Sequence, residues 1–183
     1  MAQQTIYIRY FGPIDEERVK KLMTALEQKL NDGTERFVIL ISSPGGNVSP
    51  GVSAYNFLKG IPAEVITHNF GSIDSMAVCL FCAGSKRLCV PHGRFLIHGI
   101  SLNVSAGARF DEKSLGEHIT RLKNERETIC RIIANNTGKK LEDVEQDMFS
   151  GITLTAEQAK DYGIVHEIKS ELFEKQAEVI SIT

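Results

Sequence analysis

The stretch FVILISSPGGNVSPG, residues 37–51, joins a run of apolar residues to a loop rich in glycine and proline. Five consecutive apolar residues, Phe37–Ile41, are typical of a strand that is buried on both faces of a parallel sheet. Proline and paired glycines then end the strand, because they favour turns over regular structure. The next segment, Val52–Leu58, is predicted to be a short helix. This order of strand, loop and helix indicates an α/β protein.

The rest of the chain continues the alternation of strands and helices. Thr5–Tyr10 alternates in polarity with the period of two that is typical of a strand. Later strands are predicted at Ala63–His68, Arg87–Val90, Arg94–His98 and Ile164–Ile168, and Gly71–Ser75 is predicted to turn into a helix over Met76–Ala83. Further helices are predicted after the N-cap Asp15, from Leu115 to Ile133, over Leu141–Phe149, and from the capping box Thr155–Gln158 to Gly163. No repeat or linker divides the chain, so we predict one α/β domain over residues 1–183.

Composition excludes several functional classes. The 183 residues are 42% hydrophobic and 24% charged, with a formal net charge of −2, whereas binding to nucleic acid or to an anionic membrane needs a basic excess. The longest apolar run, Met76–Ala83, has eight residues, far short of the roughly 20 in a membrane-spanning helix. The start of the sequence lacks the pattern of a secretion signal. We therefore expect a cytoplasmic protein that binds neither nucleic acid nor membranes.

The four cysteines are too few for a disulfide scaffold in a chain of this length. Cys79 and Cys82 form a C-x-x-C pair, but the pair lies within the apolar segment MAVCLFCAG. Zinc would need a second pair of ligands at a suitable spacing, and the sequence has none. We therefore predict buried cysteines that act as small hydrophobic residues, and neither a metal nor a cofactor.

Three segments carry residues that local structure does not require. The segment Ser43–Gly46 follows the buried strand. Its two glycines let the backbone approach another segment closely and direct its N–H groups outward, as an anion or oxyanion site requires. Gly71–Met76 places Ser75 directly before an apolar helix, although its serines and aspartate are also ordinary helix caps. Phe95–Gly99 ends a strand at His98, which alone is typical of a core histidine. Each signal is weak in isolation.

Together, and in this order, the three segments resemble the ClpP family, the proteolytic subunits of the Clp protease. That family has an S-P-G-G loop, a G-x-x-x-S-M segment around its nucleophile and a strand that ends in two apolar residues and histidine. Here these are Ser43–Gly46, Gly71–Met76 and Leu96–His98. Later landmarks match at 83–84 (A-G), 89–91 (C-V-P), 137–138 (T-G), 155–156 (T-A), 158–159 (Q-A) and 162–163 (Y-G). The resemblance covers residues 5–168 and implies a crotonase-like fold, a spiral of strand-strand-helix units with a protruding helical handle region.

The resemblance implies a serine endopeptidase and assigns roles to four residues of this sequence. Ser75 is the implied nucleophile and His98 the implied general base. The backbone N–H groups of Gly46 and Met76 form the implied oxyanion hole, in which a single donor is typically worth roughly 2.7–4 kcal/mol. The reaction would be acyl transfer from a peptide bond to the serine hydroxyl.

Substrate and partners follow from the same resemblance. Asn47 and Val48 begin the strip that binds the substrate backbone as an added strand. The family forms stacked rings, and residues 101–133, a polar loop and a long helix, are the implied contact of a homo-oligomer. The chain begins almost at the first predicted strand, without the family's long N-terminal segment, which argues against partnership with a Clp ATPase. Small peptides or unfolded polypeptides are therefore the expected substrates.

The sequence departs from the family where the aspartate of the catalytic triad is expected. That aspartate lies eight residues before the alanine that ends the capping-box motif, and here the position is Gly151. Asp147 is the nearest carboxylate and the first candidate for the third triad member, whereas Asp143 and Glu157 are more distant. Loss of the orienting acid costs a Ser-His-Asp protease about 10⁴ in turnover. The expected activity is therefore weak unless another residue or an oligomer completes the site.

Three alternatives stay open at this point. A signal-peptide-peptidase-like enzyme would use a lysine base, for which Lys113 and Lys123 are candidates. A catalytically weak subunit would bind peptides within a mixed ring, which Gly151 favours and the retained Ser75 and His98 oppose. A crotonase-type acyl-CoA enzyme would also place paired amides on an oxyanion, but it leaves the serine and histidine unexplained.

Overall fold

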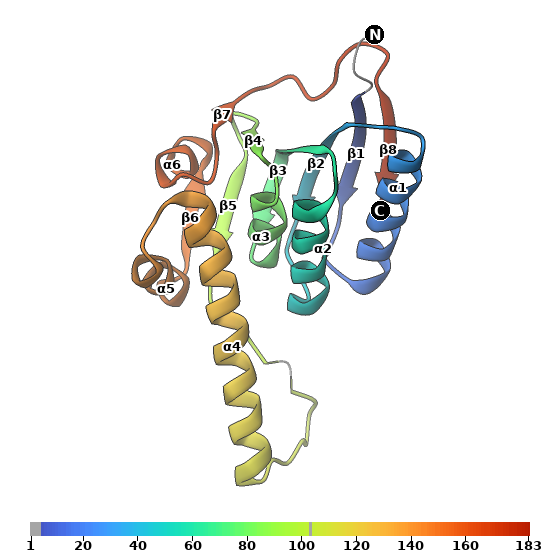
Figure 1. Cartoon of the computed structure of the whole chain (residues 1–183). Helices are drawn as coiled ribbons and strands as arrows, with labels where there is room; N and C mark the ends of the chain where they lie inside the picture. The colour runs from blue at the N-terminus through green and yellow to red at the C-terminus, as the bar shows by residue number, and fades with distance from the viewer. Residues whose placement is uncertain (1–4, 103) are drawn as a thin grey trace.

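The computed structural model describes residues 5–102 and 104–183, and eight strands of this part of the chain form one sheet (Figure 1). The strands are β1 (Thr5–Phe11), β2 (Arg36–Ser43), β3 (Glu64–Asp74), β4 (Lys86–Cys89), β5 (Arg94–Ile97), β6 (Ile152–Thr155), β7 (Glu167–Ile168) and β8 (Glu178–Ile182). The sheet runs in the order β6-β5-β3-β2-β1-β8, and β4 pairs with β3 and β7. The pairings of these strands are parallel, apart from the antiparallel pair of β5 and β6.

Six helices of the described residues pack against the sheet or extend from it. They are α1 (Glu16–Asn31), α2 (Val48–Gly60), α3 (Met76–Cys82), α4 (Glu112–Thr137), α5 (Leu141–Ser150) and α6 (Ala156–Tyr162). Figure 1 shows α1, α2 and α3 side by side over one face of the sheet. The predicted caps are present, because Asp15 accepts a hydrogen bond from the Arg18 N–H at 2.8 Å and Thr155 and Gln158 form a capping box. The alternation of strands and helices is that of the predicted α/β class.

The central strand β2 is buried on both faces, as its apolar run predicts. Phe37, Ile39 and Ile41 belong to the main core beneath the helices. Val38 and Leu40 point to the opposite face, where they form a second cluster with Tyr7, Ile66 and Leu88 and with partly buried residues of the C-terminal segment, Leu172 and Ala177. A strand that is covered on both sides has no need of polar positions.

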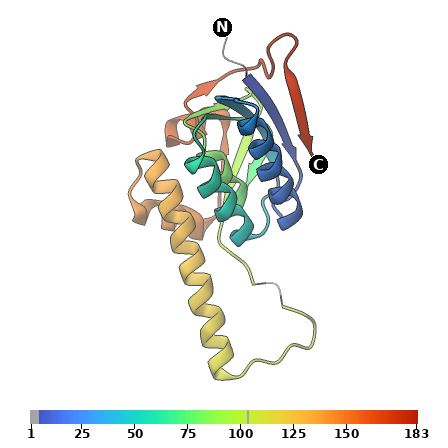
Figure 2. The same cartoon turned by 45° about the vertical axis from the view of Figure 1, so that its right-hand side comes forward.

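Helix α4 extends away from the sheet over its N-terminal half (Figures 1 and 2). Its buried residues all lie in the last third of the helix. In the protruding half, Leu115 and Ile119 are 47% and 44% exposed. The protruding helical region that the resemblance implies is therefore present. Neither α4 nor any other helix of the described residues combines the length and apolarity needed to cross a membrane.

The four cysteines are free and buried. Cys79 and Cys82 lie in α3 and are completely buried among apolar neighbours. Burial raises the pKa of the Cys82 thiol to about 11, so the thiol stays neutral and acts as a small hydrophobic group, as predicted.

The structure corrects the strand predictions at three places. Gly71–Ser75 does not turn into the helix, because β3 continues to Asp74 and pairs there with β5. The predicted strand Ile164–Ile168 is reduced to the two residues of β7. Two strands were not predicted, β6 and β8, whose partners β5 and β1 lie far away in the sequence. Of the predicted loop 101–110, residue 103 lies outside the described residues.

Candidate active site

Ser75 lies in a strained turn between β3 and α3. Its backbone angles are φ 57° and ψ −127°, in a region that side-chain-bearing residues rarely adopt and that costs about 1–3 kcal/mol. Two hydrogen bonds hold the turn, because the Ser75 N–H donates to the Leu96 carbonyl at 2.7 Å and the Val78 N–H donates to the Ser75 carbonyl at 2.9 Å. Sharp strand-to-helix turns of this kind present the serine hydroxyl of hydrolases.

The glycine loop 45–46 lies directly against this turn. Gly45 has φ +86°, and a Cβ built on it would stand 2.7 Å from the Ser75 Cβ and 3.2 Å from the Met76 backbone nitrogen. Those distances are shorter than any ordinary contact, so a side chain here would push the two segments apart. Gly45 is therefore needed for the close approach of the loop to the serine, whereas Gly46 is needed for its close approach to the Ile14 backbone.

The backbone around Gly46 is held by Ile14. The Ile14 N–H donates to the Gly45 carbonyl and the Asn47 N–H donates to the Ile14 carbonyl, both at 2.8 Å. On the other side of the serine, Met76 is the first residue of α3, where a backbone N–H has no acceptor within its own helix. Gly46 and Met76 thus come from separate segments and both line the cavity that holds Ser75, an arrangement that allows their backbone N–H groups to serve as oxyanion donors.

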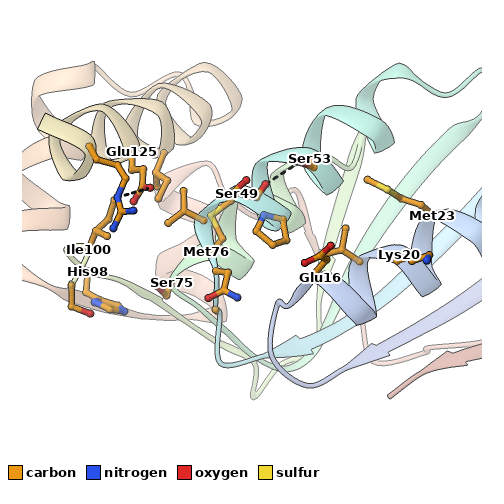
Figure 3. Close-up of a pocket in the computed structure, with 18 of the residues that line it drawn as sticks. Glu16, Lys20, Met23, Ser49, Ser53, Ser75, Met76, His98, Ile100 and Glu125 are labelled. Atoms are coloured by element: carbon orange, nitrogen blue, oxygen red, sulfur yellow. Dashed lines mark hydrogen bonds and ion pairs between the residues drawn. The ribbon is translucent and has the colours of Figure 1, made fainter. Parts of the chain in front are cut away.

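One cavity of about 1150 Å³ brings together the predicted nucleophile, base, oxyanion-hole and substrate-binding residues. These residues are Gly46, Asn47, Val48, Ser75, Met76 and His98. In Figure 3 the His98 imidazole is directed toward Ser75 at the edge of this cavity. The volume exceeds that of many small-molecule sites, which measure roughly 300–1,000 Å³, and it leaves room for an extended segment of polypeptide.

Charges of both signs line the same cavity. Its acidic residues are Glu16 and Glu27 from α1 and Glu125 from α4, and its basic residues are Lys20 and Arg121. Arg121 and Glu125 form an ion pair at 3.8 Å. Within the described residues, no three His, Cys, Asp or Glu side chains are grouped as a metal site would require. The cavity thus combines charges of both signs with apolar residues such as Val19, Met23 and Ile129.

Gly151 lies beside His98, where the resemblance places the triad aspartate. A Cβ built on Gly151 would stand 3.9 Å from the His98 Cβ. Asp147, the first candidate to replace that aspartate, accepts a hydrogen bond from the Tyr162 hydroxyl at 2.7 Å and is not among the cavity residues. The more distant candidates, Asp143 and Glu157, are exposed and also lie outside the lining. None of these three carboxylates adjoins the cavity.

The lysines considered as alternative bases are remote from the serine. Lys113 is 87% exposed in its side chain and pairs with Glu117 at 3.9 Å. Lys123 is exposed as well, and neither lysine lines the cavity. A lysine acts as a base when burial removes its proton, so the surroundings of these two residues do not favour that role.

The sequence analysis missed Asp74, the residue before the serine. It was interpreted as a helix cap, but it is the last residue of β3 and only 8% exposed. Its Oδ2 pairs with Arg94 at 3.0 Å, whereas its Oδ1 is buried without a hydrogen-bond partner. Burial raises the pKa of Asp74, against the opposing effects of Arg94 and His98. The signal in the sequence is the polar-apolar-polar order of Ser72, Ile73 and Asp74, which is compatible with a strand that continues to residue 74.

This chain is similar to known proteins both in sequence and in fold. The Clp protease family model matches residues 1–171. The ATP-dependent Clp protease proteolytic subunit 2 of Corynebacterium efficiens is 33% identical over 158 residues, which cover 85% of this chain and 77% of that protein. Subunit 3 of Rhizobium johnstonii is 32% identical over 160 residues, which cover 86% and 80%.

A solved structure confirms the predicted fold. A mutant of ClpP1 from Listeria monocytogenes matches with a TM-score of 0.81 over 92% of both chains, at 26% sequence identity. The spiral α/β architecture with its protruding helix is therefore that of this group of proteins. On the family match and on its relatives, this chain belongs to the Clp protease family.

Proposed function

We propose that this chain is a serine endopeptidase of the ClpP type that hydrolyses peptide bonds in small peptides or unfolded polypeptides. The observation that carries the proposal is the single cavity shared by Ser75, His98, Gly46 and Met76. Ser75 is strained at the head of α3, and such strain persists at sites where the surrounding structure maintains it for function.

The reaction uses two transfers of the acyl group. His98 takes the Ser75 proton while the serine oxygen attacks the peptide carbonyl, and the oxyanion accepts hydrogen bonds from the Gly46 and Met76 N–H groups. The tetrahedral intermediate collapses as His98 returns the proton to the leaving amine, which leaves an ester on Ser75. Water then attacks this ester by the same route and restores the free hydroxyl.

The substrate lies along the backbone that follows the glycine loop. Asn47 and Val48 line the cavity as the N-cap and the first residue of α2. The Asn47 N–H is bonded to the Ile14 carbonyl, so the substrate backbone would meet a helix N-terminus here and not a strand edge. Recognition through the main chain, in a cavity of mixed charge, suits unfolded polypeptides of varied sequence. It does not select substrates by one particular side chain.

We further propose that the chain acts in the cytoplasm as a homo-oligomeric ring. Residues 101–133 would supply a contact between subunits, because the protruding half of α4 carries Leu115 and Ile119 at its surface. An apolar pair on a helix that leaves its own core is suited to a second copy. The proposal includes no ATPase partner and no cofactor.

Covalent labelling with a fluorophosphonate tests this function. We expect one label per chain, located on Ser75 by mass spectrometry, and no label on Ser75→Ala. His98→Ala should slow labelling and peptide hydrolysis together, whereas Lys113→Met and Lys123→Met should leave both unchanged. A chain that stays unlabelled in every oligomeric state would instead be a peptide-binding subunit of a mixed ring. Slow labelling that depends on either lysine would support the lysine-base alternative.

A further inference from the structure

Asp74 and His98 lie at the carboxyl ends of two neighbouring parallel strands, β3 and β5. Successive side chains of a strand point to opposite faces, and Phe95 and Ile97 of β5 are buried in the core beneath the helices. Leu96, which lies between them, therefore points to the other face, and His98 directly follows the end of β5 at Ile97. On β3 the same argument applies, because Ile73 belongs to that core and Asp74 follows it.

The register of the two strands makes His98 a diagonal neighbour of Asp74. Asp74 pairs with Leu96, and the next N–H, that of Ser75, donates to the Leu96 carbonyl at 2.7 Å. Arg94 and His98 lie two residues to either side of Leu96, a separation that side chains span on one sheet face. The Arg94 guanidinium donates a hydrogen bond to Oδ2 of the Asp74 carboxylate at 3.0 Å. The buried Oδ1 has no hydrogen-bond partner, and the charge of His98 acts on this carboxylate, where it opposes the rise in the pKa of Asp74 that burial causes.

On the other side of β5, the neighbour of His98 is a glycine. Strand β6 is antiparallel to β5, with Ile97 opposite Ile152. The next position of this register places His98 opposite Gly151. Because glycine has no side chain, the imidazole has no carboxylate on this side. The two strands that flank β5 thus differ, since only β3 presents an acid toward the histidine.

We propose that Asp74 is the positioning residue for His98 and that its Oδ1 accepts the imidazole N–H that does not serve Ser75. This proposal rests on the proposed serine peptidase function. Such hydrogen bonds are often long in the free enzyme and tighten when substrate binds. The carboxylate holds the tautomer that can take the serine proton and stabilises the imidazolium that forms, which is the role of the aspartate in a Ser-His-Asp triad.

The other charged groups near His98 set the expected size of the effect. The ion pair with Arg94 partly neutralises the charge of Asp74. The carboxylate therefore stabilises the imidazolium of His98 less than an aspartate that is bound to histidine alone. Arg121 and Glu125 of α4 line the cavity and pair with each other at 3.8 Å, while Glu16 and Lys20 of α1 line it as well. We therefore expect loss of the carboxylate to cost about 10²-fold in rate, below the ~10⁴ of a complete triad.

The test compares Asp74→Asn with Asp147→Asn, the same change at a carboxylate bound to Tyr162. Asp74→Asn should slow fluorophosphonate labelling of Ser75 about 10²-fold, and the acidic limb of the kcat/KM profile should move to lower pH because the imidazolium loses its partner. Asp147→Asn should do neither. The double variant Asp74→Asn/Gly151→Asp, which moves the carboxylate to the β6 side, should recover part of the rate at a cost in stability, because Gly151 has φ +73°.

A histidine titration by NMR separates this proposal from the peptidase function. It is carried out in the Ser75→Ala background, where no catalysis is needed, and His98→Gln assigns the resonance. Asp74→Asn should move the His98 midpoint to lower pH. Arg94→Gln, which frees the carboxylate without removing it, should move the midpoint to higher pH and serves as the second variant if Asp74→Asn unfolds.

Each outcome has one meaning. If the wild type labels at Ser75 and the midpoint is the same in Asp74→Asn, Arg94→Gln and the parent, the positioning role is wrong and the peptidase stands. If the midpoint moves in the expected directions but Ser75 never labels, the Asp74–His98 pairing stands and the peptidase function is wrong.

Discussion

Replacement of Ser75 by glycine should stabilise the protein relative to replacement by alanine. Both variants remove the hydroxyl, so they differ only in how well the residue accepts the backbone angles of the turn, φ 57° and ψ −127°. Glycine adopts positive φ about as readily as negative φ, whereas alanine keeps the steric conflict of its Cβ.

The expected difference follows from two opposing effects. Relief of the strain at this position contributes about 1–3 kcal/mol. The greater freedom of glycine in the unfolded chain offsets about 0.5–1 kcal/mol of that. Ser75→Gly should therefore be more stable than Ser75→Ala by up to about 2.5 kcal/mol, which for a chain of this size corresponds to an increase of up to about 10 °C in Tm.

Urea unfolding at one fixed protein concentration measures this difference, because the stability of an oligomer depends on concentration. The matched control is Ser53, an exposed helical position in α2. There, glycine should be less stable than alanine by about 0.5–1 kcal/mol. The sign of the glycine-minus-alanine difference should thus reverse between the two positions. Glycine less stable than alanine at both positions would refute the strained turn on which the site argument depends.

Three further changes test other parts of the structure. Gly45→Ala should lower kcat/KM by about 10²–10³, the effect of losing one oxyanion donor, because the added Cβ pushes the loop away from the serine turn. The control is Gly107→Ala, where φ is similar but a Cβ would meet nothing within 4 Å. This variant should leave kcat/KM unchanged. Arg87→Met should lower the free energy of unfolding by about 3 kcal/mol or more, since buried Arg87 donates to four backbone carbonyls, and a drop below 1 kcal/mol in urea unfolding would contradict this. Burial lowers the pKa of His68, so the unfolded chain binds more protons and stability should fall as pH drops below about 6.5. Urea unfolding between pH 5 and 8 should show a smaller slope for His68→Gln and the parent slope for exposed His92→Gln.

The local patterns of the sequence predicted the central strand, the capped helices and the α/β class. Each of these depends on neighbours within a few residues, as in the apolar run Phe37–Ile41 or the hydrogen bonds of Thr155 and Gln158. Motif order then assigned Ser75 and His98 to one site, and the structure brings both to the same cavity. Features that depend on residues close together in the sequence could thus be predicted from the sequence alone.

Pairings between distant segments could not be predicted in that way. β8 forms at residues 178–182 because β1 offers it an open edge, and the last residues of β3 are a strand because β5, about twenty residues later, supplies their partner. The same pairing places Asp74 near His98 and Gly151 on the far side of it. The relation of these three residues depends on which strands become neighbours in the sheet and in which register, and the partners are separated by long stretches of sequence whose spacing does not identify them.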